Sequence, residues 1–260
     1  MGSAMKCIEI VFSPTGGTRK VADILATELS GEVVLVDLSD KKGDFASVNI
    51  DSDGMALIAM PCFGGRAPRV SMERLACMRG GGARAVVVSV YGNRAFDDAL
   101  VEMVDGAREA GFDVIAAVAA VAEHSIMPQY ASGRPVLADE NLLAAIGREI
   151  RGALDGDRPV NAMPVPGDRP YKTSGAVPLV PQVKKTCTAC GRCVANCPVG
   201  AIDSATLKAD KDRCITCMRC LKECPVQARA INGLLVKAAA GAIKKQASAW
   251  KEPELFAVPE

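Results

Sequence analysis

Two cysteine runs constrain this chain more than any other feature of its 260 residues. "CTACGRCVANCP" begins at Cys187 and "CITCMRCLKECP" at Cys214, and both follow the pattern C-x2-C-x2-C-x3-C-P. Gaps of two residues let one loop wrap three thiolates around an iron–sulfur cube. Structural zinc also uses C-x2-C pairs, but it has no use for a third cysteine two residues later. The runs therefore predict iron–sulfur clusters.

The runs resemble those of bacterial-type two-[4Fe–4S] ferredoxins, and the resemblance covers residues 183–232. In such ferredoxins the fourth cysteine of each run binds the other cluster. Because a module this small cannot fold on its apolar surface alone, the clusters would also form its core. The resemblance implies two ligand sets, which are Cys187, Cys190, Cys193 and Cys224 for one cluster, and Cys214, Cys217, Cys220 and Cys197 for the other.

The chain before these runs alternates between two kinds of segment. From Lys6 to about Leu154, apolar runs of strand length alternate with longer segments of helical period. This alternation predicts a parallel sheet with helices on both faces. "MALIAM" and "AVVVSV" are apolar enough for strands that are buried on both sides. We expect strands near 6–12, 32–38, 55–61, 84–90 and 113–121, and helices near 18–29, 69–78, 96–110 and 139–154.

Composition divides the chain further. Residues 155–182 hold six prolines and little periodicity, which favours an extended interdomain connection. The other interpretation is an ordered arm that packs on the first domain, and the two are compatible. The domains are then expected at 1–154 and 183–232, with a C-terminal helix and tail at 233–260.

One turn in the first domain has the composition of an anion site. "FSPTGGTRK" lies between the first expected strand and the first expected helix. It lacks the lysine of a Walker A loop, and the chain has no G-x-G-x-x-G. Such a turn aims backbone N–H groups at an anion, and the hydroxyls of Ser13, Thr15 and Thr18 add further donors. A monophosphate can be held there without a metal or a lysine.

This turn resembles the phosphate loop of flavodoxins, (S/T)-x-T-G-x-T, with Gly17 at the variable position. "PCFGGRAP" and "VYGNRAFDD" follow the third and fourth expected strands, where the flavin of that fold lies. The resemblance implies an α/β, flavodoxin-like, doubly wound sheet of five parallel strands in the order 2-1-3-4-5, and bound FMN. The phosphate would be bound by Ser13, Pro14, Thr15, Gly16, Gly17 and Thr18. The ring would be flanked by Pro61, Cys62, Phe63, Gly64, Gly65, Arg66, Tyr91, Gly92, Asn93, Arg94, Phe96 and Asp97.

Two residues near these loops have open roles, and no catalytic residue is assigned. His124 is the only histidine, and it would either protonate a reduced flavin or substrate, or cap a loop by hydrogen bonds. Cys62 would be either a redox thiol or a small buried loop residue.

With "EHS" at 123–125, "GRP" at 133–135 and the cysteine module, the chain resembles flavodoxin–ferredoxin fusion proteins of anaerobic bacteria and archaea. This implies an electron-transfer oxidoreductase that passes electrons between two [4Fe–4S] clusters and FMN. It would exchange them with a redox protein, either a ferredoxin, a flavodoxin or a reductase. The alternatives are an FMN-dependent reductase of a quinone or another small acceptor, and a binding or sensing module with structural clusters.

Charge and hydropathy limit the remaining partners. The formal net charge of +1 gives no reason to expect a nucleic acid. It divides into an acidic first domain, with 15 Lys/Arg against 20 Asp/Glu over 1–154, and a basic module, with 9 against 4 over 183–232. The longest apolar run, at 114–122, is too short for a membrane span, and no signal peptide is evident. We therefore expect a cytoplasmic protein, and a homodimer is left open.

Overall fold

The computed structural model describes residues 6–156, 163–173 and 179–257. Each strand and helix expected in the first domain is present there, with small shifts at its ends. The strands are β1 (Cys7–Val11), β2 (Val33–Asp37), β3 (Met55–Pro61), β4 (Arg84–Tyr91) and β5 (Asp113–Val121). The helices are α1 (Gly17–Leu29), α2 (Arg69–Leu75), α3 (Ala99–Glu109) and α4 (Leu137–Leu154), and a short 3-10 turn, η1, covers Phe45–Ser47.

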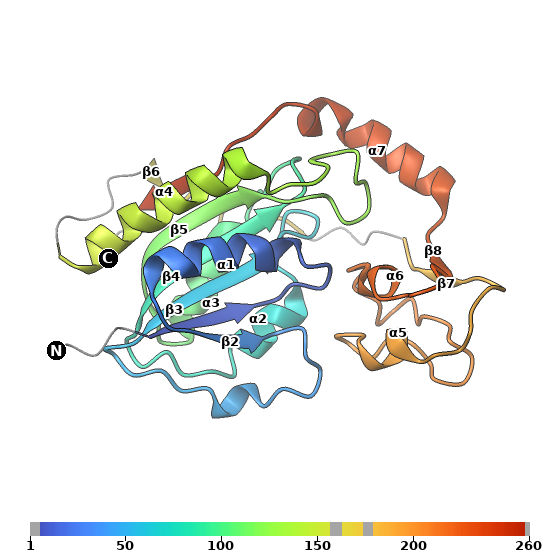
Figure 1. Cartoon of the computed structure of the whole chain (residues 1–260), viewed down its shortest axis with the longest axis horizontal. Helices are drawn as coiled ribbons and strands as arrows, with labels where there is room; N and C mark the ends of the chain where they lie inside the picture. Colours follow the sequence, from blue (N-terminus) through green and yellow to red (C-terminus); the bar gives the residue numbers. More distant parts are fainter. Residues whose placement is uncertain (1–5, 157–162, 174–178, 258–260) are drawn as a thin grey trace.

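The sheet of the first domain has the predicted topology. Its strands run in the order β2-β1-β3-β4-β5, and all four of these pairings are parallel. Helices α1 and α4 cover one face, and α2 and α3 cover the other (Figure 1). Strand β3 is buried along almost its whole length because it has a helix layer on each side. The doubly wound order 2-1-3-4-5 is thus confirmed.

The sheet contains two strands beyond the five predicted, because the chain's last described residues return to it. Strand β9 (Glu254–Ala257) pairs antiparallel with β5, and β6 (Met163–Pro164) pairs with β9. Among the described residues the sheet therefore has seven strands. Phe256 of β9 is 3% exposed and joins the hydrophobic core. An apolar strand such as β5 would otherwise leave an open edge, which folded proteins usually cover.

Part of the proline-rich connection is an ordered arm on the first domain. The backbone amides of Asp168 and Lys172 donate hydrogen bonds of 3.0 and 2.7 Å to the carboxylate of Asp98. Arg169 forms an ion pair of 2.6 Å with Asp105. Residues 157–162 and 174–178 of this connection lie outside the described residues. For 163–173, the structure matches the alternative of a packed arm.

The cysteine module is built as a structural repeat. Helix α5 (Arg192–Ala195) follows the start of the first run, α6 (Arg219–Lys222) follows the start of the second, and β7 (Gln182–Val183) pairs with β8 (Arg229–Ala230). Equivalent positions of the two runs share a left-handed backbone. The matched pairs, each with positive φ, are Ala189 with Thr216, Gly191 with Met218, and Gly200 with Gln227.

The module lies beyond the carboxyl ends of the strands of the large sheet (Figure 1). Ile215 of the second run packs against the core of the first domain. Helix α7 (Gly233–Ala247) then leads back from the module, and its Ala240 and Ala247 pack against Met127 and Tyr130. These contacts bring the two predicted domains directly together.

No helix in the described part of the chain combines the length and apolarity that crossing a membrane requires.

Candidate functional site

A cavity of about 290 Å³ lies where the loops after β1, β3, β4 and β5 meet. It is lined by twelve of the residues predicted to bind flavin, namely Pro14, Thr15, Gly17, Thr18, Pro61, Cys62, Phe63, Gly64, Gly65, Tyr91, Gly92 and Arg94. Six other predicted residues do not line it, namely Ser13, Gly16, Arg66, Asn93, Phe96 and Asp97. The loops thus meet at the predicted edge of the sheet, although some of the predicted residues do not line the cavity.

The first loop forms an open cradle at the start of α1. Gly16 has a φ of 93° at the N-cap position, and a Cβ added there would meet nothing within 4 Å. Ser13 Oγ accepts a 2.9 Å hydrogen bond from the Arg19 amide, so this hydroxyl holds the loop on the helix. The first helical amides, those of Gly17 and Thr18, have no intrahelical acceptor. Amides at a helix N-terminus beside two threonine hydroxyls suit a phosphate group.

The second loop is a tight turn that requires glycine. The backbone N–H of Phe63 donates to the Arg66 oxygen at 2.8 Å, and the reverse bond measures 3.2 Å. Gly64 and Gly65 lie between them, both with positive φ. A Cβ on Gly65 would lie 2.3 Å from Asp97 Oδ2, so no other residue fits without displacing the third loop. The Arg66 side chain turns away from the cavity and pairs with Glu102 at 2.6 Å.

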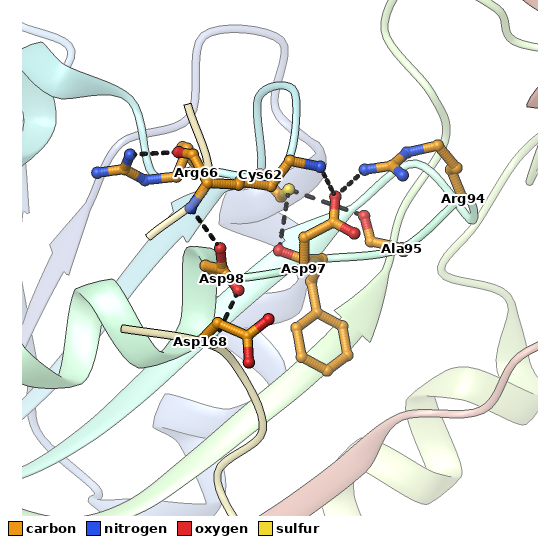
Figure 2. A network of polar contacts seen from close by, with 9 residues as sticks. Cys62, Arg66, Arg94, Ala95, Asp97, Asp98 and Asp168 are labelled. Atoms are coloured by element: carbon orange, nitrogen blue, oxygen red, sulfur yellow. Dashed lines mark hydrogen bonds and ion pairs between the residues drawn. The ribbon is translucent and has the colours of Figure 1, made fainter. Parts of the chain in front are cut away.

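Cys62 fastens the third loop to the end of β3. Its Sγ lies 3.5 Å from the Phe96 oxygen and 3.8 Å from the Ala95 oxygen, and Figure 2 shows the contact between Cys62 and Ala95. Burial raises the pKa of this thiol to about 12, so it remains protonated at neutral pH. These contacts match a small, partly buried loop residue and give no support to a redox thiol.

Charged side chains fix the rim of the same loop. Arg94 forms an ion pair with Asp97 (Figure 2), and Lys172 of the ordered arm reaches Asp97 at 3.0 Å. Arg94 lines the cavity, whereas Asp97 does not. The ion pairs hold the pKa of Asp97 below its ordinary value, although its partial burial acts in the opposite direction. The Asp97 carboxylate is therefore a positioning group for Arg94.

The aromatic and amide residues of the third loop serve the fold. The Asn93 side chain donates hydrogen bonds of 2.7 and 2.9 Å to the Ala247 and Ala249 oxygens, which anchors the end of α7. The Phe96 ring packs edge-on against Tyr91, with 5.4 Å between ring centroids. Tyr91 is only 3% exposed. Phe63, the other predicted aromatic residue that lines the cavity, is only partly buried.

His124 belongs to a fourth loop at this edge, which follows β5. Its Nδ1 accepts hydrogen bonds from the amides of Ile126 and Met127 at 3.2 and 3.3 Å. Burial lowers the pKa of the imidazole, so the ring stays neutral at physiological pH. A Cβ on Gly92 would lie 2.5 Å from His124 Cδ2, and glycine is what lets the two loops approach. His124 thus caps its own loop.

Several lining residues were not predicted. Glu123, Ser125, Ile126 and Met127 come from the fourth loop, whose position after the fifth expected strand was a usable signal. Five further unpredicted residues come from the connection or the far end of the chain, namely Leu179, Thr216, Cys217, Ala239 and Ile243. Nothing in the local sequence of Thr216 or Cys217 indicates that they face this cavity.

The eight cysteines surround two separate hollows. The first, the outer set, comprises Cys187, Cys190, Cys193 and Cys224. The second, the inner set, comprises Cys197, Cys214, Cys217 and Cys220. These are the groupings that the ferredoxin resemblance implied, with the fourth cysteine of each run contributing to the other set. Within the three described ranges, no three His, Cys, Asp or Glu side chains are close enough for a single metal ion.

Other groups at the two hollows also fit iron–sulfur clusters. The amides of Ala201 and Ala228 donate to Cys197 Sγ and Cys224 Sγ at 3.3 and 3.1 Å. Hydrogen bonds to sulfur of this kind stabilise cluster thiolates. Arg229 lines the outer hollow, and its Nη1 is buried without a partner among the described residues. A buried N–H group of this kind requires an acceptor, which a bound cluster would offer.

A family model described as "4Fe-4S dicluster domain" matches residues 186–228. The chain joins a flavodoxin-like domain to a 4Fe-4S dicluster domain. The first domain is flavodoxin-like because its strands run in the order β2-β1-β3-β4-β5.

Solved structures similar to this chain include flavodoxins. An archaeal flavodoxin is 15% identical over 58% of this chain and 99% of its own, with a TM-score of 0.41. A flavodoxin of Streptococcus pneumoniae TIGR4 is 22% identical over 58% and 98%, with a TM-score of 0.37. The rubredoxin oxygen:oxidoreductase of Desulfovibrio gigas is 16% identical over 58% of this chain but only 36% of its own, with a TM-score of 0.41. A comparison with curated protein sequences found no match.

Proposed function

We propose that this chain transfers electrons between FMN, bound in the 290 Å³ cavity, and two [4Fe–4S] clusters in the cysteine module. One observation carries the proposal. The cavity is lined both by Thr15 and Thr18 of the first loop and by Thr216 and Cys217 of the second cysteine run. A flavin in this cavity would therefore lie against the inner cluster set, and electrons would need no diffusing carrier between the two.

The residues of the cavity fit FMN. The amides of Gly17 and Thr18, with the hydroxyls of Thr15 and Thr18, would hold the phosphate. The ring would lie between the Phe63 to Gly65 turn and the loop that follows β4. Leu179 and Ile243 add apolar walls that exclude water. When bound, FMN exchanges electrons singly or in pairs, whereas each cluster exchanges one at a time.

The two cluster sets have different surroundings. Cys217 of the inner set lines the cavity, while Cys190 of the outer set is exposed to solvent. Exposed Lys184, Lys185 and Arg192 lie close to the outer cysteines in the sequence. Electrons would enter or leave through the outer set and reach the cavity through the inner set. Positive charge near the entry point suits an acidic redox protein, such as a ferredoxin or a flavodoxin.

The contacts favour an electron carrier over a reductase of small molecules. A reductase would use His124 or Arg94 as a proton donor or substrate anchor. His124 Nδ1 already accepts two backbone hydrogen bonds, and Arg94 is paired with Asp97. Both groups thus have structural partners in the described part of the chain.

Anaerobically purified protein should contain about eight iron atoms and one FMN per chain. Stopped-flow mixing with reduced ferredoxin should then bleach the cluster bands and reduce the flavin in the same transient. Zinc in place of iron, or clusters that never exchange electrons with the flavin, would overturn the proposal. Fast multiple turnover with a quinone but not with ferredoxin or flavodoxin would instead identify the reductase.

A further inference from the structure

The repeat within the cysteine module is broken at one buried position. The first run continues from Cys197 as "CPVGAI" and the second from Cys224 as "CPVQAR", so Arg229 occupies the position that Ile202 has in the first. Ile202 is 6% exposed and lines the inner hollow, to which the preceding Cys197 also belongs. Arg229 is 5% exposed and lines the outer hollow. A buried cation therefore replaces a buried aliphatic side chain at only one of two equivalent sites.

The Arg229 guanidinium contacts the outer set directly. Its Nη2 donates a 3.0 Å hydrogen bond to Cys193 Sγ, and its Nη1 is buried with no partner among the described residues. The backbone is fixed by pairing with Val183 across β7 and β8, so the side chain has little freedom to reach solvent. An unpaired buried cation is costly, and the anionic cysteines of a cluster would provide the missing counter-charge.

The position of the guanidinium favours the outer set. Among the described residues it donates a hydrogen bond to sulfur only in the outer set, and Arg229 lines the outer hollow but not the inner one. Its influence on the two clusters should therefore be unequal.

We propose that Arg229 raises the reduction potential of the outer cluster above that of the inner cluster, so that the outer cluster holds the first electron. The potential of such clusters depends on nearby charge and on hydrogen bonds to sulfur. Reduction adds one electron from a low-potential donor and makes the cluster more negative, which a fixed cation stabilises. No bond forms or breaks in this step. The inference rests on the dicluster domain and does not depend on FMN.

The test is an anaerobic redox titration of the full chain, followed by EPR, with Arg229→Ile as the main variant. This change introduces isoleucine, the residue that the first run has at the equivalent position, Ile202. At a fixed potential, the reduced-to-oxidised ratio of the higher-potential cluster should fall about tenfold, equivalent to 59 mV for one electron. The other cluster should shift less. Lys211→Met removes one exposed charge from the same module and serves as the control.

The proposal is overturned if Arg229→Ile keeps about eight iron atoms and neither cluster shifts more than in the Lys211→Met control. It is equally overturned if only the lower-potential cluster shifts. Where the isoleucine variant loses iron, Arg229→Gln is measured instead, because glutamine keeps a long side chain with N–H donors and removes only the charge. It should lower the same potential, and an unchanged titration of this variant also rejects the proposal.

Discussion

Arg74 Nη2, on helix α2 of the flavodoxin-like domain, donates a 2.7 Å hydrogen bond to the backbone oxygen of Pro198, which directly follows Cys197 of the inner set. The same guanidinium donates to the Leu38 oxygen and lies over the Phe45 ring, 5.3 Å from its centroid. Arg74 thus joins the loop that follows β2 to the cysteine module. Lys41 forms a second link to the module, because its Nζ donates a 2.9 Å hydrogen bond to the Val194 backbone oxygen.

Arg74→Ala should loosen the cysteine module without unfolding either domain. A hydrogen bond from a charged group contributes about 1.5–3 kcal/mol. Amide hydrogen exchange near Pro198 and Leu38 should therefore accelerate by about tenfold or more. Arg69→Ala is the control, because Arg69 lies on the same helix and, within the described part of the chain, its ion pair is with exposed Glu73. Equal exchange in the two variants would show that Arg74 does not hold the module.

Thr15→Asp should weaken FMN binding and leave the iron content intact. The aspartate would place a negative charge beside the site proposed for the phosphate, at a loop that now offers amides and hydroxyls. Flavin and iron per chain would be measured on the same anaerobic preparation. Thr27→Asp adds the same charge to the exposed face of α1 and should retain FMN. Unchanged flavin occupancy in Thr15→Asp would count against the proposed phosphate site.

Local patterns were sufficient to predict the parallel sheet with helices on both faces and the iron–sulfur clusters, whereas the strand order and the grouping of the cysteines came from the resemblances to flavodoxins and ferredoxins. Buried strands such as β3 are continuous apolar runs, and cluster ligands have fixed spacings, so both signals lie within a few residues. Strand β9 escaped prediction because it has four residues, and its place is decided by the open edge of β5.

The parts of the site that sequence did not predict depend on contacts between distant segments. Arg66 was expected beside the ring, but Glu102 and Tyr171 draw its guanidinium away from the cavity. Thr216 and Cys217 could not be predicted at the cavity, because only the docking of the module brings them there. Periodicity and spacing describe one element at a time and do not indicate which side chains meet across an interface.

Asp139→Asn should strongly destabilise the flavodoxin-like domain. Arg134 and Asp139 form an ion pair of 2.5 Å, with side chains only 2% and 1% exposed. Removing the carboxylate would leave the Arg134 cation buried without its partner, which costs about 3–5 kcal/mol. Unfolding can be followed by the fluorescence of Trp250, the single tryptophan, whose ring lies 3.9 Å from the Arg134 guanidinium. Asp155→Asn, in the exposed pair with Arg151, should change stability by less than about 1 kcal/mol.

Glu9 should make stability fall as pH rises toward neutrality. It lies within β1 with a side chain that is 0% exposed, and burial raises its pKa from 4.5 to about 7, although Arg19 at 3.3 Å acts in the opposite direction. Between these two values the folded chain holds a proton that the unfolded chain has lost. The contribution of Glu9 is therefore fully present below pH 4.5 and is lost as pH rises through about 7.

Glu9→Gln should remove this dependence, because glutamine keeps the shape of the protonated acid and does not ionise. Relative to the wild type, the variant should gain roughly 2–3 kcal/mol between about pH 5 and pH 8. Anaerobic unfolding midpoints measured across that range would show the gain as a widening difference between the two proteins. Glu73→Gln alters an exposed carboxylate paired with Arg69 and should follow the wild-type curve. Parallel curves for Glu9→Gln and the wild type would mean that Glu9 is already ionised in the folded chain, held as a carboxylate by Arg19.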